Sequence, residues 1–398
     1  MPAERLTLVF FVDALGWEIV RDSDCFTSIA PHRWRQRTVL GYSCAAQPTI
    51  LTGKLPSEHG HWGMFYRAEC SEMRSLRVFG LIPPMISYHY RFRRQVLKWH
   101  RRRSGFSGYY NLYRVPWRLF GQFDLIEKRD IYAPGGFVDI DAPGPARMPE
   151  APATVSSIFD ELAARSIPWR SWSWKDGFDQ GFAELEASFH EDDRPAFALH
   201  YTPYIDGFLH GHVGDEEAVA GAVRKVEEKI LHAVEAAREV YDEVDVVLFS
   251  DHGMAETVGS HDVMATVARL GLAEGRDYLA FYDSTMARFW FENPRAERAV
   301  RAALGELDCG AFLTDAGLRR EGVYFEDHRF GELIFLMNPG ELIVPSYMGG
   351  RAPRGMHGFS PDHEDSYAVL MSSFDVSPAP EHIRDSFSVM MKAVGLQP

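Results

Sequence analysis

The chain has 398 residues, of which 46% are hydrophobic, 13% aromatic and 25% charged, and its formal net charge is −14. This composition excludes a disordered chain and leaves room for one large α/β domain with insertions, or for two domains. The four cysteines (Cys25, Cys44, Cys70 and Cys309) show no paired spacing, which argues against a disulfide framework and a thiolate zinc site. We therefore expect a protein of a reducing compartment.

The first predicted element is a buried strand at 6–13, which ends on Asp13. Its apolar run is too short to span a membrane and no small-residue cleavage site follows it, so we expect a cytoplasmic protein. Further strands are predicted at 196–202, 245–253, 286–291, 331–340 and 367–373, and helices at 153–166, 215–244 and 381–394.

Strands that alternate with helices predict an α/β fold with a doubly wound, mostly parallel sheet that is covered by helices on both faces. In such sheets, catalytic groups gather at the carboxyl ends of the strands. Asp13 and Asp251 each follow an apolar strand. Both are therefore expected at this edge of the sheet.

Two segments interrupt the alternation. Residues 66–150 are rich in Arg and aromatic residues and lack a clean period, and residues 261–354 have the pattern of a smaller α+β insertion. We therefore predict a core made of residues 1–65, 151–260 and 355–398, which carries a basic, aromatic cap insertion and a second inserted subdomain.

Acids and histidines recur where predicted segments end. Each of them alone is explained by a helix cap, a turn or a surface loop. Together they supply three carboxylates and three imidazoles, a set suited to two zinc-like or manganese-like ions without any cysteine. The six residues are Asp13, Asp206, His210, Asp251, His252 and His357.

Ser43 lies in the small-residue segment GYSCAAQPTILTG, residues 41–53. The segment alone leaves open whether Ser43 is a turn residue or a nucleophile, and the neighbouring thiol of Cys44 is a further candidate nucleophile.

The order and spacing of these motifs resemble the alkaline phosphatase superfamily, and within it the type I phosphodiesterase/nucleotide pyrophosphatase branch. The motifs are Asp13 after a strand, Ser43 ten residues before Gly53, Leu55-Pro56 with His59-Gly60, Asp206-x-x-x-His210, Ser250-Asp251-His252-Gly253-Met254, and His357-Gly358. The resemblance covers most of the chain apart from the two insertions.

The resemblance implies a two-metal site. Asp206, His210 and His357 would hold one divalent ion, and Asp13, Asp251, His252 and the Ser43 oxygen would hold the other. We expect zinc, with manganese as the alternative. Ser43 would then be the nucleophile and would become transiently phosphorylated.

The sequence departs from this branch at two positions. Nucleotide pyrophosphatases usually carry a Thr nucleophile, and Met64 stands where they carry an Asn that donates to a phosphoryl oxygen. We therefore take His61, Met64 and Arg67 as candidates for substrate binding. The segment SCAAQ lacks the Pro and Arg that follow the nucleophile in sulfatases, which disfavours sulfate esters.

Charge is distributed unevenly along the chain. Residues 67–129 contain 14 Lys or Arg and four acidic residues, so this segment carries +10 and the remainder −24. The part at 91–123 is predicted either to pack on the core with solvated arginines, or to contact an anionic, partly apolar substrate or a membrane surface. The acidic remainder would repel a long nucleic acid, so the expected partner is a small or lipid-linked phosphoester.

The predicted function is a metal-dependent phosphohydrolase, in the first place a phosphodiesterase that acts through phospho-Ser43. One alternative is a phosphomonoesterase or phosphotransferase with the same site. Another is a peripheral anion-binding or membrane-binding protein with a vestigial metal site; the presence of all six ligand side chains argues against it. The sequence does not indicate an oligomeric state.

Overall fold

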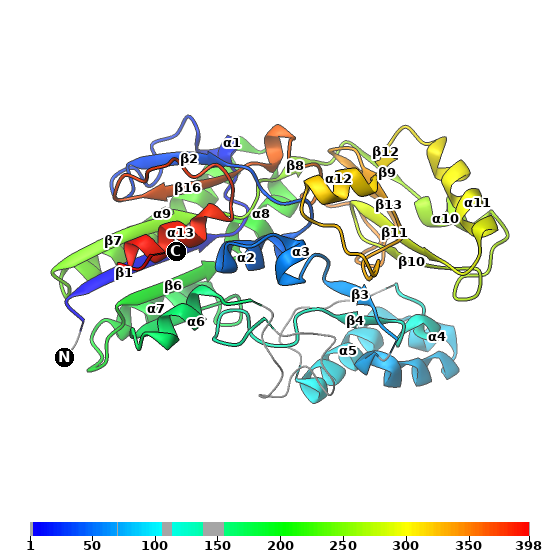
Figure 1. The fold of residues 1–398 in the computed structure, drawn as a ribbon, viewed down its shortest axis with the longest axis horizontal. Helices are drawn as coiled ribbons and strands as arrows, with labels where there is room; N and C mark the ends of the chain where they lie inside the picture. Colours follow the sequence, from blue (N-terminus) through cyan, green and yellow to red (C-terminus); the bar gives the residue numbers. More distant parts are fainter. Residues whose placement is uncertain (1–2, 70, 106–113, 138–154, 398) are drawn as a thin grey trace.

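A computed structural model describes residues 3–69, 71–105, 114–137 and 155–397 (Figure 1). Within these residues, six strands form the central sheet in the order β2-β16-β7-β1-β6-β5. Their bounds are β2 His32–Gln36, β16 Ala368–Ser372, β7 Glu243–Phe249, β1 Arg5–Val12, β6 Phe197–Thr202 and β5 Trp169–Trp172. All six strands come from segments that the sequence analysis assigned to the core, although the domain boundaries themselves remain a prediction.

The central sheet is mostly parallel, as predicted. β1 pairs in parallel with β6 on one side and with β7 on the other, and β5 pairs in parallel with β6. The exception is β16, which runs antiparallel to both β7 and β2. The parallel strands therefore end at one edge of the sheet, and this edge receives the side chains that follow β1 and β7.

Helices cover both faces of this sheet because β1 is apolar on both sides. Leu6, Leu8 and Phe10 belong to one hydrophobic cluster, which includes α7 (Phe178–Ser188) and α9 (Glu216–Arg238). Val9 and Phe11 point to the other face and pack in a cluster that includes α2 (Ser43–Thr52), α6 (Ile158–Ala164) and α13 (Asp385–Ala393). The predicted doubly wound α/β fold is confirmed.

A second sheet lies at the end of the molecule away from the N-terminus (Figure 1). Its four described strands have the order β10-β11-β13-β12 and the bounds β10 Tyr278–Tyr282, β11 Met286–Phe291, β13 Leu333–Met337 and β12 Gly310–Phe312. The cap elements η1 (Glu72–Leu81) and α5 (Tyr90–Ser104) share one hydrophobic cluster with this sheet. The cap therefore packs on the second sheet.

Short elements complete the fold. Paired strands are β3 Phe65–Arg67 with β4 Phe123–Leu125, β8 Ala255–Glu256 with β15 Gly355–Met356, and β9 Gly259–His261 with β14 Glu341–Ile343. The remaining helices are α1 Trp17–Val20, α3 Pro56–His59, α4 Pro84–Ser87, α8 Tyr204–His212, α10 Val263–Ala268, α11 Pro294–Gly305 and α12 Asp315–Arg320, with 3₁₀ turns η2 Trp117–Leu119 and η3 Glu364–Ser366.

The predicted elements differ from the observed ones mainly at their ends. The helix predicted at 215–244 ends at Arg238, because Glu243 and Val244 already pair with Arg5 and Leu6 of β1. The strand predicted at 331–340 is confined to β13, since Gly331 and Gly340 adopt φ values of 142° and 81°. The first two residues of the helix predicted at 153–166 lie outside the described residues.

None of the helices in the described ranges combines the length and the hydropathy that crossing a bilayer requires.

A buried histidine of β6 predicts acid sensitivity. His200 is 2% exposed, packs against Phe182 at 4.1 Å between ring centroids, and has its pKa lowered to about 4 by burial. This neutral imidazole stabilises the fold fully above pH 6.5, and the stabilisation is lost as the pH falls towards 4. The loss amounts to about 2 kcal/mol between pH 7 and pH 5.

Urea unfolding at pH 7 and pH 5 tests this expectation. His200→Phe is expected to lose less stability on acidification than the wild type, whereas the exposed His190→Gln control should behave as the wild type does. Equal losses for wild type and His200→Phe would show that His200 does not contribute.

Candidate active site

Two buried carboxylates lie side by side at the carboxyl end of the central sheet. Asp13 follows β1 and Asp251 follows β7, and their exposed fractions are 2% and 0%. Asp13 Oδ2 accepts a hydrogen bond from the Tyr201 hydroxyl, while Asp251 Oδ1 accepts from the backbone amides of Ala14, at 3.2 Å, and His252, at 3.1 Å. Each carboxylate thus has one oxygen fixed by the protein.

His252 joins these acids to the predicted nucleophile. Its Nδ1 lies 3.0 Å from the carbonyl oxygen of Gly253, which can only accept, so Nδ1 carries the proton of a neutral ring and Nε2 keeps its lone pair. Nε2 lies 3.3 Å from Asp251 Oδ2, 3.6 Å from Asp13 Oδ1 and 3.0 Å from the Ser43 hydroxyl oxygen. Ser43 is the first residue of α2, where backbone amides without helical acceptors create partial positive charge.

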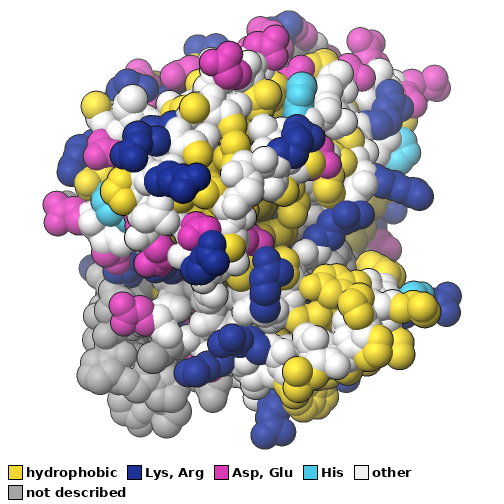
Figure 2. Space-filling model, turned by 90° about the vertical axis from the view of Figure 1, so that its right-hand side faces the viewer, with side chains coloured by type: hydrophobic (Ala, Val, Ile, Leu, Met, Phe, Trp, Pro, Cys, Tyr) yellow, Lys and Arg dark blue, Asp and Glu magenta, His cyan; other side chains and the backbone are white. Residues whose placement is uncertain are grey.

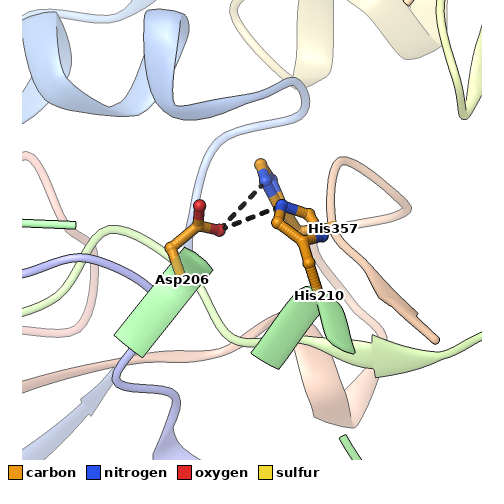
Figure 3. A group of neighbouring side chains, drawn as sticks. All are labelled: Asp206, His210 and His357. Carbon is orange, nitrogen blue, oxygen red and sulfur yellow. Dashed lines mark ion pairs between the residues drawn. The ribbon is translucent and has the colours of Figure 1, made fainter. Parts of the chain in front are cut away.

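A second cluster combines two residues of α8 with one from a loop (Figure 3). Asp206 and His210 are four residues apart and share one face of the helix, and His357 follows β15. Oδ1 of Asp206 lies 3.5 Å from Nε2 of each histidine. Nδ1 of His210 donates to the Gly355 carbonyl at 2.8 Å, which leaves Nε2 free to face the carboxylate.

The two clusters are neighbours. The rings of His252 and His357 stack, with centroids 3.8 Å apart and planes 13° from parallel. One histidine belongs to each cluster, so this stack connects the two candidate sites directly.

The free atoms of both clusters fit divalent cations. Asp13 Oδ1, Asp251 Oδ2 and Asp206 Oδ1 are buried without a hydrogen-bond partner, and these are the same oxygens that face the imidazole Nε2 atoms. Within each cluster the candidate ligand atoms lie within 4.8 Å of one another. Buried unpaired carboxylate oxygens are costly unless a cation binds them, and Asp and His are ligands that zinc and manganese accept.

The pKa values of Asp13, Asp251 and His357 are shifted mainly because these side chains are buried. Burial, followed by the charges of Asp251 and Asp206, raises the pKa of Asp13 well above its usual range. Burial also raises the pKa of Asp251 to about 7. The pKa of His357 is lowered by burial and by the neighbouring rings of His252 and His210, so this ring stays neutral and able to bind a cation. Within the described part of the chain, no Lys or Arg is among the causes of the pKa shifts of Asp13 and Asp251, so the negative charge of these carboxylates is not balanced by such a side chain.

The described contacts of the three predicted substrate-binding residues are with other parts of the chain. His61 is buried against Phe137 at 5.2 Å between rings, and burial lowers its pKa to about 4. Met64 packs against the hydrophobic cluster of the second sheet. The Arg67 guanidinium lies 3.0 Å from Glu292 and 3.8 Å from Glu332, so its charge is already paired near the surface.

A polar chain that the sequence did not predict supports Asp13. Tyr132 donates to Gln47 Oε1 at 3.1 Å, and Gln47 Nε2 donates to the Tyr201 hydroxyl at 3.1 Å, which in turn donates to Asp13. Gln47 lies one helical turn after Ser43 on α2. Residues four apart share one face of a helix, so the spacing of Gln47 from Ser43 could have predicted that Gln47 lies near the candidate site.

A family model described as type I phosphodiesterase/nucleotide pyrophosphatase matches residues 118–360. The chain belongs to this family. The matched range contains Asp206, His210, Asp251, His252 and His357, and it begins after Asp13 and Ser43. Membership in the type I phosphodiesterase/nucleotide pyrophosphatase family makes the protein a hydrolase that acts on phosphoester bonds.

Solved structures of ectonucleotide pyrophosphatase/phosphodiesterase 5 (ENPP5) share the fold of this phosphodiesterase-family chain. The murine protein matches with a TM-score of 0.66 at 12% identity, and the human protein with 0.67 at 10%. An inactive threonine-to-alanine variant of the murine protein in complex with AMP gives 0.65 at 13%. Each match covers 99% of this chain and 96% of the other. A search of curated protein sequences found no match.

Proposed function

We propose that this protein is a metal-dependent phosphodiesterase that acts through a phospho-Ser43 intermediate. Asp206, His210 and His357 would hold one divalent ion. Asp13, Asp251 and His252, with the Ser43 oxygen, would hold the other. The observation that carries the proposal is the pair of adjacent clusters, whose unpartnered carboxylate oxygens face imidazole nitrogens beside a serine hydroxyl.

The reaction has two displacements at phosphorus. Two divalent ions would lower the pKa of the Ser43 hydroxyl and neutralise charge on the phosphoryl group. Ser43 Oγ loses its proton and forms a bond to phosphorus as the bond to the leaving alkoxide breaks, and the alkoxide takes up a proton to become the alcohol. Water then attacks phosphorus, releases the phosphomonoester and restores the Ser43 hydroxyl. The N-terminal end of α2 would favour the negative charge that develops beside Ser43.

The substrate is proposed to be a small-molecule phosphoester. The murine ENPP5 variant was solved in complex with AMP, which supports a ligand of this class in a chain of the same fold. Zinc is the proposed metal because imidazole and carboxylate ligands suit it, and manganese is the alternative to be tested.

Hydrolysis of bis(p-nitrophenyl) phosphate and of p-nitrophenyl phosphate, with purified protein loaded with zinc or manganese, tests the proposal. We expect faster turnover of the diester and loss of turnover after chelation. Faster turnover of the monoester would assign a phosphomonoesterase instead. Chelator-resistant turnover of either compound would overturn the metal-dependent mechanism.

Tyr201→Phe is expected to weaken metal binding about tenfold, because side chains that hydrogen-bond to a metal ligand typically contribute this much to metal affinity. The substitution removes the hydroxyl that donates to Asp13 and accepts from Gln47, while the ring still stacks on Tyr132. Calorimetric titration of the metal-free protein with zinc measures the change.

Tyr241→Phe is the matched control, since the Tyr241 hydroxyl donates to the Pro195 carbonyl and is likewise buried. Unchanged zinc affinity in Tyr201→Phe, or an equal loss in Tyr241→Phe, would contradict a role of Tyr201 in positioning Asp13.

A further inference from the structure

Large hydrophobic side chains are exposed in one short stretch of the cap. Among the described residues, eight such side chains are exposed, and seven of them lie between positions 78 and 99. They are Val78, Leu81, Met85, Ile86, Tyr88, Tyr90 and Trp99. We call this set the cap patch. Figure 2, which views the molecule from the right-hand side of Figure 1, shows hydrophobic side chains gathered at the lower right. Clustered exposure of this kind marks a binding surface, whereas single exposed residues are ordinary.

The stretch of sequence that carries the cap patch contains positive charges only. No acidic residue occurs between Glu72 and Asp124 in the sequence. Exposed cations flank the patch on η1 and α5: Arg77, Arg91, Arg94, Lys98, Arg102 and Arg103. None of the ion pairs among the described residues involves Arg91, Arg94 or Lys98. These charges are therefore available to an anionic partner.

Two cavities with shared lining residues lie between the cap patch and the candidate active site. Tyr88 and Tyr90 line one end of an open groove of about 1020 Å³, together with Arg114 and residues 348–351. A second cavity of about 280 Å³ shares Met348, Gly349 and Arg351 with the first and reaches His210. The segment 348–351 therefore borders both the cavity beside the cap patch and the cavity beside one of the two Asp/His clusters.

We infer that the cap patch docks this protein on the surface of an anionic lipid bilayer. Apolar side chains would enter the boundary between headgroups and acyl chains, and the arginines would pair with lipid phosphates and carboxylates. The combination of protruding apolar residues, aromatic rings and unopposed cations favours this partner over a neutral protein surface. The docking surface differs from the segment 91–123 predicted from sequence, since its most exposed residues precede α5, and residues 106–113 lie outside the described residues.

Vesicle sedimentation tests this inference without relying on catalysis. The wild type is expected to bind vesicles of phosphatidylserine and phosphatidylcholine more tightly than vesicles of phosphatidylcholine alone, and less tightly as salt is added. Leu81→Asp combined with Met85→Asp should weaken binding about tenfold or more, as should Arg91→Ser combined with Arg94→Ser. Leu81 and Met85 are 86% and 89% exposed, so these changes should leave the fold intact.

Val258→Asp is the matched control, because Val258 is 75% exposed and lies outside the cap patch. It should bind vesicles as the wild type does. All variants should hydrolyse soluble bis(p-nitrophenyl) phosphate at the rate of the wild type, which separates a failure of docking from a failure of the proposed catalytic function.

Four results would overturn the inference. Three concern vesicle binding: the absence of wild-type binding to anionic vesicles, equal binding by the Leu81→Asp and Met85→Asp double variant, and an equal loss in Val258→Asp. Patch-dependent self-association in sedimentation velocity, without vesicle binding, would assign the cap patch to a second copy of the chain and would also overturn it.

Discussion

Ser43→Ala is expected to lower phosphodiester hydrolysis by about three orders of magnitude or more, because the first bond to phosphorus can no longer form. The fold should persist, since Ala is a favourable residue in α2 and the side chain is only half-buried. Initial rates with bis(p-nitrophenyl) phosphate measure the loss. Mass spectrometry after acid quenching should find a p-nitrophenylphosphoryl group on Ser43 in the wild type.

Cys44→Ala provides the matched control at the neighbouring position. Burial raises the pKa of the Cys44 thiol to about 12, and its Sγ lies 3.5 Å from the Trp62 carbonyl oxygen, to which it donates. A thiol in this state is a poor nucleophile, so activity should change by less than about threefold. Full activity in Ser43→Ala together with a large loss in Cys44→Ala would move the nucleophile to the thiol.

Asp251→Asn is expected to have opposite effects on stability and on activity. In the metal-free protein the Asp251 carboxylate is buried, and its Oδ2 has no hydrogen-bond partner. An amide in its place can keep the bonds from Ala14 and His252 while the charge is removed, so the metal-free variant should be more stable by on the order of 2 kcal/mol. Activity should fall at least about a hundredfold, because a ligand of the proposed second ion is lost.

Thermal unfolding with and without zinc distinguishes the two effects. The wild type should gain stability when zinc is added, whereas Asp251→Asn should gain little, because the binding free energy adds to that of folding. Asp22→Asn, at a carboxylate that is 84% exposed, should follow the wild type in both states. A metal-free Asp251→Asn protein that is less stable than the metal-free wild type would show that the carboxylate is not a destabilising charge.

The grouping of Asp13 with Asp251 could be predicted because each follows an apolar strand, and parallel strands end at a common edge. His357 was harder to place. It follows the two-residue strand β15, which has no periodic pattern, so only the resemblance to a known family connected it with Asp206 and His210. The roles of these residues remain a prediction that the geometry supports.

The cap helix α5 was missed for a physical reason. Its buried face consists of Arg93, Val96, Leu97 and His100, which have helical spacing, but two of the four are residues that a hydrophobic pattern counts as polar. Arg93 can be buried because its guanidinium lies 4.3 Å from the Trp117 ring and donates to the Val115 carbonyl. Tyr201 was missed because an aromatic residue in a buried strand is ordinary core, and its bond to Asp13 exists only in the folded chain.

Because the cap packs on the second sheet, its sequence can change independently of the central sheet that carries Asp13 and Asp251. Val96, Leu97 and Trp117 share a hydrophobic cluster with Phe281 and Trp290, whereas the side chains of β1 belong to two other clusters. Substitutions that reshape η1 or α5 therefore leave the strand ends beside Asp13 and Asp251 unstrained. The exposed surface of the cap can therefore differ between related chains without a change in the positions of Asp13 and Asp251.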